Sequence, residues 1–248
     1  MTFAWDGTKL SPAPEPAGKM RVADSWRQVD GRVRRLDLHQ LRFAQAVAAC
    51  ESGLDGGAMV SAAAALVPKS GEWFPRARLV ERTLYLDLRR GPKRRPSVVV
   101  QVLPTGDHRS NPWVKGPDLA ATAELITSAH AVGADEVLLR NGCGHVLEAG
   151  HAAVVWWDSN ALCFPSAELP VLPSVTRALV EARARVMGIE VRRVSASLLD
   201  LNGREVWLLN AFQGIRLVTG WINADITPGA GERFHTWRAA LDDALEPV

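Results

Sequence analysis

One stretch, residues 115–148, changes its hydrophobic period halfway along, and this change restricts the folds open to the chain. Pro117 suits the first turn of a helix, because a backbone N–H at that position has no intrahelical partner. Apolar residues then recur at helical spacing up to Gly133, a typical helix stop. A buried strand follows, and Asn141-Gly142 is a strong hairpin signal before the returning strand. With strands and helices on both sides, this stretch predicts a mixed α/β (α+β) fold.

Two charged residues bracket the stretch. Lys115 falls on the loop that enters the helix, and Glu148 ends the returning strand. Each is a modest signal alone, because a single lysine is usually a solvated cation and a single glutamate usually a surface charge. Their spacing leaves the function open.

The composition limits the class of protein. A chain of 248 residues with 47% hydrophobic content can form one large domain or two moderate ones. The net charge of +2 gives no global electrostatic reason to expect nucleic acid or an anionic membrane as a partner. No run approaches ~18 apolar residues, and the first twenty residues carry Pro, Gly and charges where a signal peptide needs an apolar run. We therefore expect a globular protein without a membrane span.

The cysteines bear on the compartment. Cys50, Cys143 and Cys163 are an odd number, with no C-x-x-C spacing and no histidine in ligand register. This pattern argues against a disulfide framework and against a zinc site. A cytoplasmic location and no metal site are the expectations.

Local patterns predict the elements of the first hundred residues. The expected elements are an extended or loosely held arm at 11–16, strands at 22–29, 32–36, 84–88 and 97–103, and helices at 38–50, capped by Asp37, and 61–67. The first helix should place Leu41, Ala44 and Ala48 on its apolar face. The strand at 97–103 is expected to pair with the strand at 84–88.

Two polar stretches suggest the domain boundary. The basic run 89–95 is better explained by a Gly-Pro turn with solvated charges than by a nucleic-acid patch, since no aromatic residues interleave it. Gly106, Asp107 and Asn111 are typical of a linker. We expect an N-terminal α/β domain at 1–103, a linker at 104–114 and a C-terminal α/β domain at 115–248.

The last hundred residues contain one further site candidate. The expected elements are strands at 154–157, 162–164 and 206–209 and helices at 175–187 and 234–245. The unpaired N–H groups at the start of the helix at Val175 could hold a phosphate. The signal is weak alone, because most helix starts bind only water.

Several short motifs carry a family resemblance. They are Asp30-Gly31-Arg32, His39-Gln40-Leu41-Arg42-Phe43, Lys115, Gly133-Ala134-Asp135-Glu136, Gly144-His145-Val146-Leu147-Glu148, Leu172-Pro173-Ser174-Val175-Thr176-Arg177 and Asn210-Ala211-Phe212. In this order they resemble the class IV aminotransferases. These are the fold-type IV pyridoxal-phosphate enzymes, which include branched-chain and D-amino-acid transaminases and aminodeoxychorismate lyases. The resemblance spans residues 22–219 and implies a two-domain architecture with the cofactor between the domains.

The resemblance implies roles for the two bracketing residues. Lys115 would form a Schiff base with pyridoxal 5'-phosphate and then move protons as general base and acid. Glu148 would face the pyridine nitrogen, where a carboxylate favours the protonated ring and strengthens its action as an electron sink.

The resemblance also implies a phosphate site. Arg42 matches the family's phosphate-binding arginine. The N–H groups of Val175 and Thr176 would bind other phosphate oxygens, with help from the Thr176 hydroxyl. Asn210-Ala211 is similar to the family's last turn on the phosphate side.

Three positions depart from the family pattern. Ala120 stands five residues after the lysine, where transaminases tend to carry a tyrosine, and the only tyrosine, Tyr85, belongs to the other expected domain. Asp118 stands where many relatives have asparagine; it either points at the cofactor or caps the helix. The glycine-rich segment that usually precedes the first strand is not recognisable in Gly18-Lys19-Met20.

These positions bear on the reaction. The Asn210-Ala211-Phe212 turn and the missing tyrosine favour an aminodeoxychorismate lyase, which releases pyruvate and 4-aminobenzoate. Asp118 replaces the lyase branch's asparagine and favours instead an amino-acid transaminase, which passes the amino group to a 2-oxo acid. A cofactor-binding homologue without turnover is the further alternative, and the retention of Lys115 and Glu148 argues against it.

The resemblance finally implies partners. The substrate would be small, either amino-acid-like or aminodeoxychorismate-like. The chain would form a homodimer in which the partner's N-terminal domain closes each site.

Overall fold

The computed structural model describes residues 1–104 and 106–248, and over these residues the chain divides into two compact units. The first unit comprises Met1–Lys93, Val114–Pro117 and Ala244–Val248, and the second comprises Arg94–Trp113 and Asp118–Asp243. This division differs from the expected one. Strand β9 (Ser97–Val102) belongs to the second unit, Lys115 belongs to the first, and residues 106–113 are part of the second unit instead of a separate linker.

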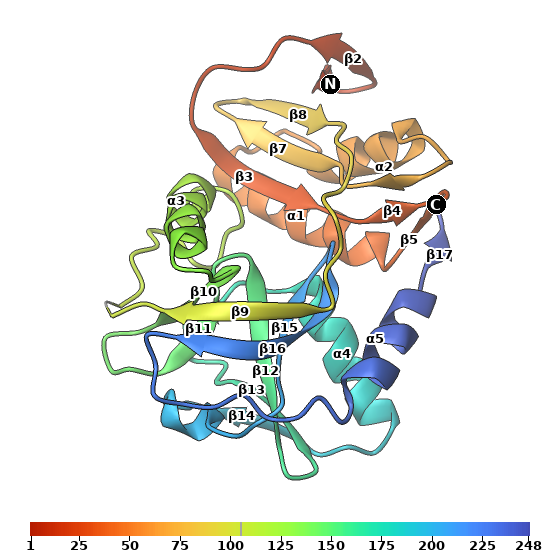
Figure 1. Cartoon of the computed structure of the whole chain (residues 1–248). Helices are drawn as coiled ribbons and strands as arrows, with labels where there is room; N and C mark the ends of the chain where they lie inside the picture. Colours follow the sequence, from red (N-terminus) through yellow and green to blue (C-terminus); the bar gives the residue numbers. More distant parts are fainter. Residues whose placement is uncertain (105) are drawn as a thin grey trace. The chain divides into compact units, whose positions relative to one another are not determined.

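The first unit is built on an antiparallel sheet with the strand order β2-β1-β8-β7-β3. Its strands are β1 (Thr2–Trp5), β2 (Leu10–Ala13), β3 (Met20–Ser25), β7 (Arg76–Val80) and β8 (Thr83–Asp87). Helices α1 (Leu36–Cys50) and α2 (Gly56–Leu66) pack on it (Figure 1). Alternate residues, such as Leu84 and Leu86, face the helices because side chains alternate along a strand. The unit therefore has its own apolar core.

Helix α1 buries a different face from the expected one. Its buried residues are His39, Phe43 and Val47, whereas Leu41 is 53% exposed. Both sets follow helical spacing, and the face that contains the Phe43 ring is the one that packs against the core. The expected cap is also wrong, because Asp37 lies in the first turn and no side chain caps the helix.

A smaller sheet completes the first unit, with the order β17-β5-β4-β6. Its strands are β4 (Gln28–Val29), β5 (Arg32–Val33), β6 (Glu72–Trp73) and β17 (Glu246–Pro247). Asp30 and Gly31 join β4 to β5 with φ values of 47° and 71°, as a tight hairpin requires. The expected strand at 22–29 is therefore interrupted, with the buried Trp26 between β3 and β4.

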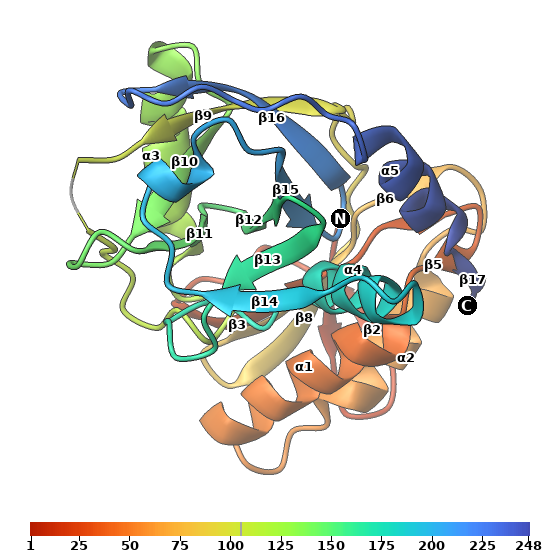
Figure 2. The same ribbon diagram turned by 90° about the horizontal axis from the view of Figure 1, so that it is seen from below.

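The second unit contains a sheet that closes on itself. Its order is β11-β10-β9-β16-β15-β12-β13-β14, and β11 also pairs with β12. The strands besides β9 are β10 (Glu136–Arg140), β11 (Val146–Ala149), β12 (Ala152–Asp158), β13 (Ala161–Pro165), β14 (Val191–Val194), β15 (Val206–Asn210) and β16 (Gly214–Ile222). Figure 2 looks into the resulting ring of strands β9 to β12, β15 and β16. Side chains such as Leu138, Trp156 and Leu208 pack together in one core of this unit.

Helices pack on other faces of these strands. α3 (Leu119–Ala131) contributes Ile126 to a core with β10 and β11, and α4 (Val175–Val186) and α5 (Phe234–Asp243) pack on β12, β13 and β15. Trp157 contacts Trp207 and Trp237 with ring centroids 5.7 Å apart in each pair. These tryptophans are core residues, as is usual for buried aromatic side chains.

The structure confirms the helix and hairpin expected in residues 115–148. Helix α3 ends next to Gly133, whose φ is 82°, and β10 pairs antiparallel with β11. The expected pairing of 97–103 with 84–88 is wrong, because β9 lies between β10 and β16 and is parallel to both. In the described part of the chain no helix is both long and apolar enough to cross a membrane.

Candidate active site

Lys115 lies on the loop that enters α3, as the sequence predicts. Its carbonyl accepts a hydrogen bond from the N–H of Ala23 at 2.6 Å, which ties the loop to β3. The next residue, Gly116, has a φ of +140°, and a Cβ on it would lie 2.8 Å from the Cα of Val22. Glycine suits both this backbone conformation and this close approach. The fold therefore fixes the backbone of Lys115 against a strand of the first unit.

Arg42 of α1 binds a fully buried carboxylate in the same unit. Nε and Nη2 of Arg42 donate to Oδ2 and Oδ1 of Asp24 at 2.7 and 2.8 Å. Nδ1 of His39 lies 2.8 Å from Oδ1 of the same carboxylate. Burial would raise the pKa of Asp24, but the charges of Arg42 and His39 outweigh it and lower the pKa far below its usual range. Asp24 therefore fixes the position of Arg42.

The role of Asp24 has a faint signal in the sequence. It is a lone carboxylate in β3 between the buried residues Ala23 and Ser25, and such a charge needs a partner. Ala23 binds the carbonyl of Lys115, so the groups that hold Lys115 and Arg42 are neighbours on one strand.

Glu148 is a buried carboxylate of β11, with 5% of its surface exposed. Its Oε1 accepts hydrogen bonds from the N–H of Leu172 at 3.1 Å and from Nη1 of Arg109. Its Oε2 has no hydrogen-bond donor among the described residues. Burial raises the pKa of Glu148 above its usual value, although the guanidinium of Arg109 acts in the opposite direction. One carboxylate oxygen is thus held and the other is open.

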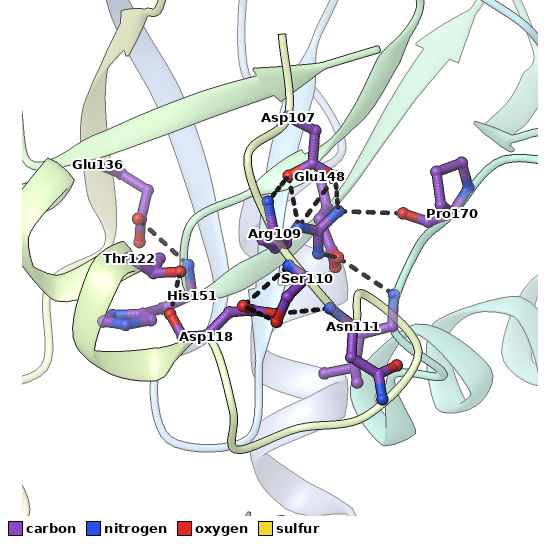
Figure 3. Close-up of polar contacts among 11 residues, drawn as sticks. Asp107, Arg109, Ser110, Asn111, Asp118, Thr122, Glu136, Glu148, His151 and Pro170 are labelled. Carbon is purple, nitrogen blue, oxygen red and sulfur yellow. Dashed lines mark hydrogen bonds and ion pairs between the residues drawn. The ribbon is translucent and has the colours of Figure 1, made fainter.

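Arg109 is held in turn by Asp107. Its Nη2 donates to Oδ2 of Asp107 at 2.7 Å and to the carbonyl of Pro170 at 3.0 Å. Its Nε lies 2.9 Å from Oδ1 of Asp107. Figure 3 shows the guanidinium between the carboxylates of Asp107 and Glu148. Sequence reasoning misses this contact, because Gly, Asp and Asn content marks a turn without showing what its side chains touch.

Asp118 is turned toward the loop that precedes it. Its Oδ1 accepts hydrogen bonds from the N–H of Ser110 at 2.9 Å and from the hydroxyl of Ser110 at 2.7 Å. Its Oδ2 accepts one from the N–H of Asn111 at 2.9 Å (Figure 3). Partial burial opposes the charge, but the backbone donors of Ser110 and Asn111 outweigh it and lower the pKa of Asp118. Asp118 is the N-cap residue of α3, but its side chain makes no hydrogen bond to an N–H of the helix. The prediction that this side chain caps the helix is therefore wrong.

The start of α4 has open backbone donors. Ser174 caps the helix, with its Oγ accepting from the N–H of Arg177 at 3.2 Å and its carbonyl accepting from the N–H of Ala178 at 3.0 Å. The N–H groups of Val175 and Thr176 have no acceptor within the described chain, although both residues are buried. Open N–H groups at the positive end of a helix favour an anion.

Asn210 ends β15 at a turn that its own side chain stabilises. Its Oδ1 accepts a hydrogen bond from the N–H of Gln213 at 2.7 Å. Ala211 lies within this turn, which closes at Gly214 with a φ of 71°. The geometry is that of a side chain that replaces a backbone group in a tight turn.

The expected site residues fall into two groups. In the first unit, Lys115 and Arg42 are tied to neighbouring residues of β3. In the second unit, Glu148 is tied through Leu172 to the segment that begins α4 at Val175. Within residues 1–104 and 106–248, no cluster of His, Cys, Asp or Glu is arranged to hold a metal ion.

Comparison with known proteins gives a family match. The family model described as amino-transferase class IV matches residues 21–221. No curated protein matches the sequence. This match covers most of the chain and confirms the resemblance seen in the motifs.

Solved structures share the fold. A fold IV transaminase from Curtobacterium pusillum has a TM-score of 0.80 at 19% identity, with 97% of this chain and 96% of that chain covered. A putative 4-amino-4-deoxychorismate lyase from Legionella pneumophila has a TM-score of 0.78 at 17% identity, with 94% and 96% covered. A branched-chain amino acid aminotransferase from Escherichia coli has a TM-score of 0.82 at 16% identity, with 97% and 93% covered. At these identities the likeness confirms the mixed α/β fold and does not separate the reactions.

Proposed function

Because the chain belongs to the class IV aminotransferase family, we propose that it binds pyridoxal 5'-phosphate at Lys115 and acts on a small substrate that carries an amino group. Enzymes of this family use pyridoxal phosphate. The observation that carries the proposal is the buried carboxylate of Glu148 with its open Oε2. Oε1 of this carboxylate already has two donors, and a protonated pyridine nitrogen is a suitable donor for Oε2.

The phosphate group fits the donors that the chain offers. The open N–H groups of Val175 and Thr176 at the start of α4 would bind phosphate oxygens, and the guanidinium of Arg42, whose charge is shared with Asp24, would add a charge-assisted donor. The Asn210-Ala211 turn would lie on the same side of the cofactor, as the family resemblance implies.

The side chains of the site would then divide the chemistry. Pyridoxal phosphate, when bound, would withdraw electrons from the substrate carbon that carries the amino group. Lys115 would hold the cofactor through Nζ until the substrate arrives, and its neutral amine would then take the proton from that carbon. Glu148 would keep the pyridine nitrogen protonated and so keep the ring electron-poor.

For the reaction itself, we propose elimination, with pyruvate and 4-aminobenzoate released from 4-amino-4-deoxychorismate. Lys115 would remove the proton from the ring carbon that bears the amino group, and departure of the enolpyruvyl group would leave an aromatic product. The Asn210 turn and Ala120 support this choice. Asp118 weighs little against this choice, because its contacts with the N–H groups of Ser110 and Asn111 are ones that the oxygen of an asparagine could partly accept.

Amino-acid transamination is the second candidate, because it needs the same Lys115 and Glu148. The test is incubation of the purified enzyme with 4-amino-4-deoxychorismate and, separately, with a panel of amino acids. Pyruvate released without a 2-oxo acid acceptor would support elimination. Conversion of the cofactor to its amine form by an amino acid, reversed by 2-oxoglutarate, would show a transaminase. Bound cofactor with neither reaction would support a homologue without turnover.

Cofactor attachment is tested independently of the reaction. Borohydride reduction followed by peptide mapping should place a pyridoxyl group on Lys115, and the Lys115→Ala variant should carry none. A label on Lys69 or Lys93 in the unaltered protein would contradict the assignment.

We also propose a homodimer in a reducing cytoplasm. The family resemblance supports the dimer, and the free thiols of Cys50, Cys143 and Cys163 fit a reducing compartment. Light scattering should give a mass of twice the 26.9 kDa chain. A mass of one chain at micromolar concentration would argue against the dimer.

A further inference from the structure

We propose that Arg109 and Asp107 are positioning residues for the reaction, which act through Glu148 by fixing its orientation and the net charge around it. The inference rests on the proposed function, because it concerns the carboxylate that would face the cofactor. It extends that function to residues that lie outside the matched motifs.

The geometry fixes Glu148 from one side. Arg109 and the N–H of Leu172 both donate to Oε1, so the carboxylate cannot rotate without breaking two hydrogen bonds. Arg109 has little freedom itself, since it also binds Asp107 through Nη2 and Nε and the carbonyl of Pro170 through Nη2 (Figure 3). The orientation that leaves Oε2 open is therefore imposed by Arg109 together with the N–H of Leu172.

The loop that carries Arg109 is anchored as well. The next residue, Ser110, donates its N–H and its hydroxyl to Asp118 at the start of α3. Because a backbone held on both sides loses conformational freedom, the guanidinium approaches Glu148 from a fixed direction. Asp118 supports this arrangement without touching Glu148 in any contact of the described residues.

The charges of the cluster explain why Asp107 is needed. Arg109 and Glu148 alone would form a neutral pair, and a neutral pair would do little to favour a protonated pyridine nitrogen. The side chain of Asp107 is 10% exposed and binds the same guanidinium, so the three side chains together keep one negative charge. Arg177 of α4 also acts on Glu148, but its charge is shared with Glu181. The cluster thus combines a fixed carboxylate with an uncancelled charge.

The test measures the cofactor nitrogen directly. Pyridoxal phosphate labelled with ¹⁵N in the ring would be bound to the unaltered protein and to Asp107→Asn and Arg109→Met, and the ¹⁵N chemical shift would report whether the nitrogen is protonated. Dissociation constants would also be measured for pyridoxal phosphate and for its 1-deaza analogue, which lacks that nitrogen. The ratio of the two constants isolates the contribution of Glu148, whereas a general loss of structure would weaken both ligands alike.

We expect a protonated nitrogen and a preference of about tenfold or more for pyridoxal phosphate in the unaltered protein, as for a charge-assisted hydrogen bond. In Asp107→Asn, which leaves a neutral pair, the preference should fall to about twofold and the nitrogen should lose its proton. Arg109→Met removes the side-chain donor to Oε1 but leaves both carboxylates, so the preference should fall through lost orientation while the nitrogen stays protonated. Asp107→Asn keeps the shape of the side chain, so it remains informative if Arg109→Met does not fold. Arg216→Met is the matched control, because Arg216 forms a buried ion pair with Glu136 at 3.1 Å in the same unit. It should lower stability and leave the preference unchanged.

The outcomes separate this inference from the proposed function. A protonated nitrogen and an undiminished preference in both Asp107→Asn and Arg109→Met would overturn the roles of these residues alone. Absence of pyridoxal phosphate binding in the unaltered protein would overturn the proposed function, and this inference with it.

Discussion

Asp24 holds Arg42 with both oxygens of a carboxylate that has 0% exposure, at 2.7 and 2.8 Å. A guanidinium bound in this way presents a fixed edge, because a bidentate pair sets the plane as well as the distance. The residue that the family resemblance assigns to the cofactor phosphate is thus also the main counter-charge of a buried acid.

Arg42→Ala should therefore destabilise the fold as well as weaken cofactor binding. Removing one partner of a buried ion pair leaves a buried charge unpaired, which costs about 3–5 kcal/mol. Arg42→Lys keeps a positive charge but loses the bidentate geometry. We expect Arg42→Lys to weaken pyridoxal phosphate binding more than binding of pyridoxal, which has no phosphate. Equal weakening of both ligands would argue against a phosphate role.

His39 predicts a pH dependence of stability. Burial lowers the pKa of His39, and Asp24 offsets this only in part. A histidine with a depressed pKa in the folded state stabilises the fold above its unfolded pKa of about 6.5, and this contribution is lost as the pH falls toward the folded pKa. Urea unfolding between pH 7 and pH 5 should show stability falling by up to about 1.4 kcal/mol per pH unit from this one group. His39→Gln should show a shallower dependence; an identical slope would exclude His39 as its source.

Asp118 should matter through the loop that it binds. Asp118→Ala removes the acceptor for the N–H groups of Ser110 and Asn111 and should cost about 0.5–1.5 kcal/mol, because water can reach these partly exposed donors. Asp118→Asn should cost less than Asp118→Ala, because the asparagine oxygen can still accept a hydrogen bond from Ser110. Its cost should not be zero, because the NH2 group would face the N–H of Asn111, and both are donors. Thermal unfolding of both variants tests this order. If Asn were the more damaging change, the assigned contacts would be wrong.

Gly116 should tolerate no side chain. Gly116→Ala would place a Cβ 2.8 Å from the Cα of Val22 at a φ of +140°, which strains the backbone by about 1–3 kcal/mol and shifts Lys115. Gly142→Ala is the control, since a Cβ there would meet nothing within 4 Å. We expect lower stability and slower cofactor attachment in Gly116→Ala only. Equal behaviour of the two variants would show that the close approach is not maintained in solution.

Periodicity predicted the parts of the fold that depend on local sequence. The helix and hairpin of residues 115–148 were found because Pro117, Gly133 and Asn141-Gly142 act on their own backbone. The strands that pair with β9 were not predicted correctly. Alternation along a strand shows which side chains share a face, but it does not show which strands lie beside it. That choice depends on contacts between residues far apart in the chain.

Long-range contacts in the candidate site could not be predicted from the sequence either. Motifs indicated Lys115, Arg42 and Glu148, whose roles stay proposals. The side chains that hold them, Asp24 and Arg109, are unremarkable in sequence. A buried charge becomes visible only with its partner, because the same residue is costly without one and stabilising with one. The predicted face of α1 was wrong because Phe43 and Val47, which pack in the core, share a face with His39, whose buried partner Asp24 could not be identified from the sequence.

The order in which the chain passes between the two units limits which recombination events can preserve the site. Val114–Pro117 belongs to the first unit, while the residues on either side belong to the second, and the C-terminal strand β17 returns to the first. A genetic exchange that replaced residues 1–93 would bring a new sheet and a new Asp24 but leave the old Lys115 segment behind. Neither unit is continuous in the sequence, so an exchange that keeps Lys115 with the strand that holds it must include both segments.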